Sequence, residues 1–105
     1  MNWENYTEHV LRTANPKLTN YEAILSASLG LCGESGEVVE HIKKHYFHNK
    51  PLDKQKVLKE LGDVCYYLAW LSHSLGLSLN DAMEGNVDKL KQRHPEGFTA
   101  DYGKE

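Results

Sequence analysis

Residues 54–75 read KQKVLKELGDVCYYLAWLSHSL, and this stretch decides the fold. At about 100° per residue, its apolar side chains gather on one arc of a helix and do not alternate as those of a strand would. Asp53 stands before the stretch as an N-cap residue, and Gly76 follows it as a residue that readily adopts the left-handed conformation found at helix ends. These signals predict a helix from Asp53 to Gly76.

Signals of the same kind predict three more helices. Thr19 lies three residues before Glu22, which is the spacing of a capping box at the start of a helix. Pro95 stops the last helix, because proline is poorly tolerated in a helix interior. The expected helices cover residues 3–14, 20–47 and 79–94. No segment alternates convincingly with a period of two residues, so the sequence predicts an all-α fold of four helices.

The length and net charge of the chain exclude some classes of function. A chain of 105 residues is expected to form a single domain over residues 1–105. Its net charge of −3 argues against a nucleic-acid binder that works through a broad basic surface. No apolar run approaches the roughly 20 residues that span a bilayer, and residues 1–4 do not resemble a signal peptide. We therefore expect no membrane partner and a cytoplasmic location. A helical chain this short is also expected to need a second copy to complete its core.

Two acidic pairs carry the strongest functional signal. Glu34 and Glu37 lie in the helix 20–47, and Glu60 and Asp63 lie in the helix that starts at Asp53. The i, i+3 spacing places each pair on one face. Glu34 and Glu60 point into the apolar arcs of their helices, and Glu37 and Asp63 mark the edges. Inward-facing carboxylates need compensation, and oxygen ligands from two facing helices suit Mg²⁺ or Mn²⁺.

The helix 79–94 offers complementary groups. Asn86, Lys89 and Arg93 lie at i, i+3 and i+7, hence on one side of the helix. One interpretation is a cationic wall that faces an anionic ligand held by the metal, the arrangement that a polyphosphate site needs. The alternative is that Lys89 and Arg93 are ordinary surface residues whose stems cover apolar neighbours.

These residues match a known pattern. GESGE at 33–37, followed by ELGD at 60–63, resembles the ExxE…ExxD signature of the MazG-like nucleotide pyrophosphohydrolases, a group of all-α enzymes. NVDKL at 86–90 and RHPEGF at 93–98 look like the closing helix of that family. The resemblance covers roughly residues 21–98, which we take as the core of the domain.

The resemblance implies a four-helix MazG-like fold whose bundle is completed by a homodimer or homotetramer. It implies Mg²⁺-dependent hydrolysis of a nucleoside triphosphate to the monophosphate and pyrophosphate, as in house-cleaning of the nucleotide pool. Asn86 and Lys89 would meet the phosphates, and Glu37 would orient or deprotonate the attacking water. The residues that would hold Mg²⁺ are Glu34, Glu37, Glu60 and Asp63.

Two alternatives stay open beside this interpretation. One is a related pyrophosphatase specific for phosphoribosyl-ATP or dUTP, and the other is a non-catalytic helical module that binds a metal or assembles with partners. The base and sugar of the substrate are also open, because a canonical dNTP, a damaged nucleotide and an alarmone all fit the signature.

Several residues near the signature are ambiguous. His41, His45 and His48 are spaced to form either a second metal site, which zinc would accept, or a polar helix end beside the active site. Trp3, Tyr6 and Trp70 either belong to the core or an interface or stack on a base, and the first helix is the best candidate for a lid that contacts the base. The glycines in the two signature helices are expected to allow close approach of helices or of ligand; they are Gly33, Gly36 and Gly62.

Overall fold

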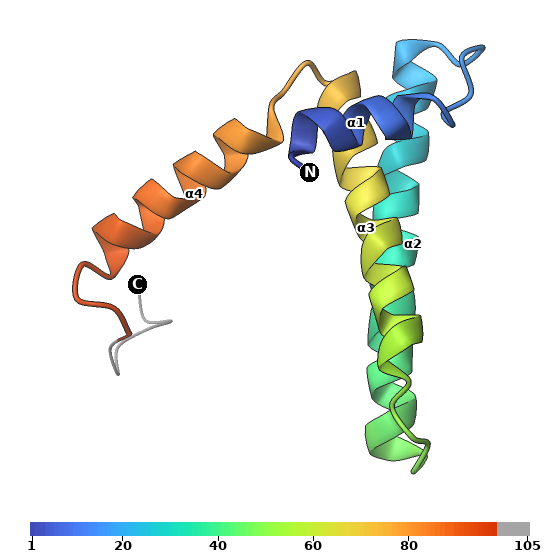
Figure 1. Ribbon diagram of the computed structural model, residues 1–105, viewed down its shortest axis with the longest axis vertical. Coiled ribbons are helices and arrows are strands. Elements are labelled where there is room, and N and C mark those ends of the chain that lie inside the picture. The colour runs from blue at the N-terminus through green and yellow to red at the C-terminus, as the bar shows by residue number, and fades with distance from the viewer. Residues whose placement is uncertain (99–105) are drawn as a thin grey trace.

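The computed structural model describes residues 1–98, so residues 99–105 of the expected domain lie outside the described part. The described chain contains four α-helices and no strand, which confirms the predicted all-α fold (Figure 1). The helices are α1 (Trp3–Leu11), α2 (Asn20–Phe47), α3 (Lys54–Ser74) and α4 (Leu79–Arg93).

The helix starts agree with the signals in the sequence. The capping box of α2 is formed, since the Thr19 N–H donates to Glu22 Oε1 at 2.9 Å and the Glu22 N–H donates to Thr19 Oγ1 at 3.1 Å. Asp53 caps α3 and Ser78 caps α4, in each case by accepting from backbone N–H groups. Gly76 follows α3 with a φ of +70°, the left-handed conformation predicted for it.

The first helix is shorter than predicted. It ends at Leu11 and not at Ala14, because the Thr13 N–H donates to the Val10 carbonyl three residues back, a tighter turn than that of an α-helix.

The core of the described chain is small. α2 and α3 form an antiparallel hairpin and lie side by side along their length, while α1 crosses α3 near the end of the hairpin (Figure 1). Ala27, Ala69 and Val10 are 0%, 1% and 2% exposed, respectively. Small side chains at the contact allow helix axes to approach closely, and this close hairpin positions the acidic residues of the two helices.

α4 extends away from the hairpin and joins the rest of the chain only near its own start (Figure 1). Asn80 donates to the Glu4 carboxylate at 2.9 Å, and Trp3 Nε1 donates to Met83 Sδ at 3.3 Å. None of residues 79–93 is buried. This arm gives the chain a radius of gyration of 17.0 Å, against about 13 Å for a compact domain of this length.

The surface of the chain is correspondingly large and apolar. Its solvent-accessible area is 8253 Å², about 2,000 Å² more than the roughly 6,000 Å² of a compact 12 kDa monomer. Tyr21, Leu29 and Phe47 on α2 are 77%, 66% and 81% exposed. Even so, no helix within residues 1–98 is both long enough and apolar enough to cross a membrane.

Candidate metal centre

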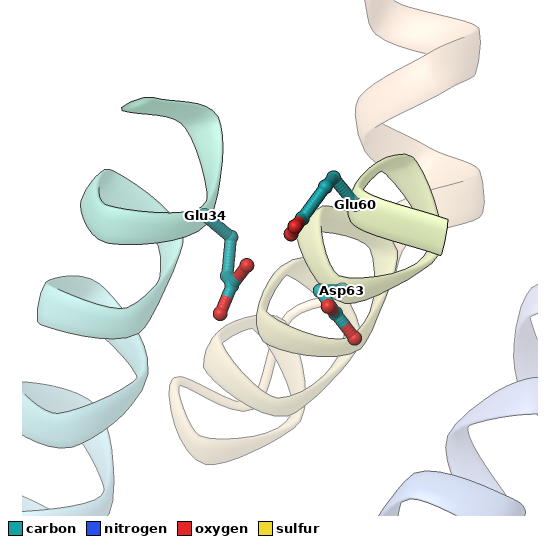
Figure 2. A group of neighbouring side chains, drawn as sticks. All are labelled: Glu34, Glu60 and Asp63. Carbon is teal, nitrogen blue, oxygen red and sulfur yellow. The ribbon is translucent and has the colours of Figure 1, made fainter. Parts of the chain in front are cut away.

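Three carboxylates from two helices converge within the α2–α3 hairpin. Glu34 comes from α2, and Glu60 and Asp63 come from successive turns of α3, as Figure 2 shows. One carboxylate oxygen from each residue lies within 4.8 Å of the others. Glu34 and Glu60 are partly buried and Asp63 is exposed. The group is therefore anchored on the hairpin and still open to a ligand from solvent.

A glycine outside the predicted set permits the close contact of the two helices. A Cβ atom on Gly30 would overlap the ring of Tyr67. By contrast, a Cβ atom on Gly33, Gly36 or Gly62 would meet no atom within 4 Å. The expectation that these three glycines allow close approach of helices is thus wrong within one chain, and the space beside them is open to a ligand or a second chain.

The three carboxylates of the group repel one another when all are ionised. A hydrogen bond between the Glu34 and Glu60 carboxyl groups raises the pKa of Glu34, and partial desolvation and the neighbouring charges of Asp63, Glu60 and Glu37 raise it further. A raised pKa means that the fully ionised group is unfavourable without a cation. The arrangement therefore favours either a shared proton or a bound cation.

Glu37 lies one turn after Glu34 but outside the converging group. Its side chain is exposed, and its negative charge still contributes to the raised pKa of Glu34. This placement agrees with the edge position given by its helical angle, 300° beyond that of Glu34 at about 100° per residue. Glu37 is close enough to act electrostatically on the group without joining it.

The three residues predicted as a cationic wall do not face the acidic group within one chain. Asn86, Lys89 and Arg93 are exposed on α4, which extends away from the hairpin (Figure 1). The chain places the acids together and leaves these groups on the arm. Only a second copy, or a different position of α4, would bring them to the acids.

α1 brings aromatic side chains beside the centre. The Tyr6 hydroxyl donates to the Gly62 carbonyl at 3.3 Å, and burial together with the charges of Cys65 and Asp63 raises the pKa of Tyr6. Trp3 packs edge-on against Tyr6 with ring centroids 5.7 Å apart. A pocket of about 230 Å³ is lined by Trp3, Tyr6 and Cys65 together with residues 1–2. No sequence signal gives this proximity, because it depends on how α1 crosses α3.

The three histidines near the end of α2 do not form a cluster. His41 Nε2 lies 3.6 Å from Glu60 Oε1, whereas His45 Nδ1 lies 2.8 Å from the Lys50 carbonyl oxygen in the loop after α2. Within residues 1–98, these histidines do not gather at metal-binding distances, and the converging group is Glu34, Glu60 and Asp63. A second metal site on this helix end therefore has no support, and His41 belongs to the surroundings of the acidic group.

The donor set fits a hard divalent cation. Three carboxylates supply oxygen ligands only, which suit Mg²⁺ or Mn²⁺ and disfavour zinc in a structural site. The raised pKa of Glu34 follows from the same closeness of the carboxylates, which a cation would compensate. The chemistry of these residues and their electrostatics thus agree on the same class of ligand.

The acidic group lies inside a part of the chain that is similar in sequence to known proteins. The model of the MazG nucleotide pyrophosphohydrolase domain matches residues 22–98, and the chain belongs to this family. It is also 31% identical over 86 residues to the Gene 37 protein of Mycobacterium phage L5, an alignment that covers 78% of this chain and 75% of the phage protein. No solved structure matches the chain significantly.

Proposed function

We propose that this chain is a Mg²⁺-dependent pyrophosphohydrolase that converts a nucleoside triphosphate and water to the monophosphate and pyrophosphate. The observation that carries the proposal is the convergence of Glu34, Glu60 and Asp63 inside the region that matches the MazG domain. House-cleaning of the nucleotide pool is the corresponding role, and the cytoplasm is the expected compartment because nucleotides are abundant there.

The carboxylates have distinct tasks in this proposal. Mg²⁺ held by Glu34, Glu60 and Asp63 would neutralise phosphate charge and make water more acidic. Glu37, exposed one turn beyond Glu34, orients the attacking water or accepts its proton. The water oxygen would form a bond to the α-phosphorus while the anhydride bond between the α- and β-phosphates breaks, and pyrophosphate would leave.

In this proposal the nucleotide base binds in the pocket beside the metal centre. Trp3 and Tyr6 line the apolar pocket next to α3, and the negative charge of Asp63 reaches Tyr6. In this proposal a base stacks on one of these rings under α1 as a lid, and its phosphates extend toward the carboxylates. Aromatic stacking contributes about 1–3 kcal/mol per base without strong base preference, so the ring contacts alone do not select the substrate.

We further propose that the working form is a homodimer or homotetramer in which α4 packs on a second copy. The excess surface of about 2,000 Å² per chain is comparable to what obligate homodimers bury. Met83, Val87 and Leu90 form one apolar face of α4, and they are 45%, 46% and 44% exposed. Packing of this face would give Asn86, Lys89 and Arg93 of one copy access to the phosphates bound by another.

Pyrophosphate release from a panel of ribo- and deoxynucleoside triphosphates, including dUTP, and from phosphoribosyl-ATP, with and without Mg²⁺, tests the proposed activity. We expect Mg²⁺-dependent release with at least one nucleotide, and a large loss in Glu37→Gln and Asp63→Asn. Full turnover in both variants would contradict the assignment of these acids. Release from dUTP or phosphoribosyl-ATP alone would identify a specialised pyrophosphatase. Metal binding without any turnover would identify a non-catalytic module.

A further inference from the structure

The Glu60 carboxylate has a neighbour besides the other two acids. His41 of α2 places Nε2 at 3.6 Å from Glu60 Oε1, and the two side chains are only 26% and 23% exposed. His41 lies seven residues after Glu34, so it projects from the same face of α2 two turns further along. Glu60 is thus flanked by two side chains of the facing helix, a carboxyl group and an imidazole.

We propose that His41 is a positioning residue whose imidazole, placed beside Oε1 of Glu60, restricts the orientation in which Glu60 binds the cation. The inference rests on the proposed function, because it takes Glu60 as a ligand of the metal centre. A carboxylate has two oxygens, so one can face an imidazole while the other serves a cation. Partners of this kind fix the geometry of metal ligands, and their loss typically weakens metal affinity about 10–100-fold.

The neighbouring histidines show that this contact is specific to His41. His45 lies one turn further along α2, and its ring meets the Lys50 carbonyl oxygen at 2.8 Å. His48 follows the last residue of α2 and is exposed. Of the three, His41 is therefore the one that α2 directs at an acid of α3. His48 provides a matched control, because it is the same residue type outside the contact.

The test measures Mn²⁺ binding by the full chain, with the metal alone and without nucleotide. Calorimetry gives the Mn²⁺ dissociation constant of each variant directly. We expect His41→Ala to raise the Mn²⁺ dissociation constant at least about tenfold. The thermal midpoint in EDTA should change little, and His48→Ala should leave the dissociation constant unchanged.

A conservative variant separates positioning from a general effect on structure. His41→Gln keeps an N–H donor at a similar reach from the backbone, so we expect it to restore most of the Mn²⁺ affinity lost in His41→Ala. Equal weakness of the two variants would overturn the proposal. Unchanged or tighter binding by His41→Ala would also overturn it.

The readouts distinguish this inference from the proposed activity. If the wild-type chain binds Mn²⁺ with a His41-dependent affinity and releases no pyrophosphate from any nucleotide, the positioning role stands and the enzymatic proposal fails. If the wild-type chain hydrolyses a nucleotide and His41→Ala keeps its Mn²⁺ affinity, the reverse holds. A wild-type chain that binds no Mn²⁺ would overturn the metal centre and the role of His41 together.

Discussion

The α2–α3 hairpin and the α4 arm are built from similar helices with different outcomes. All three helices begin at a capping residue with the expected hydrogen bonds, and all carry an apolar face. In the hairpin these faces pack on each other and bury Ala27 and Ala69, whereas α4 buries none of its residues. Local signals suffice to start a helix, but an apolar face is satisfied only where a second surface is available.

The same difference separates the two halves of the proposed site. The hairpin brings three acids together because one chain supplies both helices. The cationic residues of α4 stay apart because that helix has no partner surface within the chain. The predictions below therefore apply matched substitutions to the hairpin and to the arm, beginning with the largest expected effect.

Removal of a carboxylate should lower turnover when the residue lies on the hairpin and not when it lies on the arm. Glu34→Gln is expected to lower Mg²⁺-dependent turnover by about 10²–10³-fold, because the metal contributes several kcal/mol of charge stabilisation in the transition state. The same variant should raise the thermal midpoint in EDTA, since it removes one of the negative charges that repel one another in the metal-free chain. Glu84→Gln on the exposed surface of α4 is the control. Comparable losses in the two variants would contradict a site confined to the hairpin acids.

A charge on the apolar face of α4 should separate the copies. Val87→Asp is expected to raise the dissociation constant of the oligomer about 100-fold, a cost of about 3 kcal/mol for a charge at the centre of an interface. Gln92→Asp adds the same charge on the opposite side of the helix and should have little effect. Sedimentation over a range of concentrations measures both. A wild-type chain that remains monomeric throughout would refute packing of α4 on a second copy.

Addition of one methyl group should have opposite effects in the two regions. Gly30→Ala forces the Tyr67 ring away from its position beside Tyr66 and Trp70, at a cost of about 1–3 kcal/mol of unfolding free energy. Gly85→Ala lies on α4 opposite its apolar face with no atom near the new Cβ, and it should stabilise that helix by up to about 1 kcal/mol. Thermal unfolding would show the two signs, and a stable Gly30→Ala would mean that the hairpin contact can relax.

Loss of a helix cap should have the smallest effect. Thr19→Ala removes the side chain that caps α2 and is expected to cost about 1 kcal/mol of global stability. Ser78→Ala should instead increase hydrogen exchange in the first turn of α4 and leave the hairpin unchanged, because little packing depends on that turn. Equal shifts in the thermal midpoint of both variants would show that the arm unfolds together with the hairpin.

The capping box of α2 also predicts how the stability of the chain changes at low pH. Hydrogen bonds from the backbone and side chain of Thr19 hold the pKa of Glu22 below its ordinary value of 4.5. A lowered pKa in the folded chain means that this contribution to stability is complete above the unfolded value and is lost as the pH falls through the folded value. The stability difference between wild type and Glu22→Ala should therefore decline as the pH is lowered below 4.5. A difference that does not change with pH would contradict this role of the Glu22 carboxylate.

Much of the hairpin could be predicted from residue types and spacing. Thr19 and Asp53 predicted the starts of two helices, and the inward angles of Glu34 and Glu60 predicted that both acids would lie on the inner faces of their helices. The end of α1 was predicted too far along the chain, because nothing in the spacing of residues 3–14 indicates the tighter turn that ends at Thr13. Of the two roles expected for the signature glycines, close approach of helices belongs to Gly30 instead, since spacing alone does not tell which glycine meets a large ring across the hairpin.

The sequence by itself determined the helices, their caps and the face on which each acid lies, because these depend on contacts within about four residues along the chain. Only the tertiary structure decided which of these groups meet. It joined Asp63 to the two inward acids, left Glu37 outside, brought His41 to Glu60 and Tyr6 to α3, and kept Asn86, Lys89 and Arg93 on a separate arm. The physical reason is that such meetings depend on helix register and on the surfaces available for burial, and neither is encoded in the spacing of a single helix.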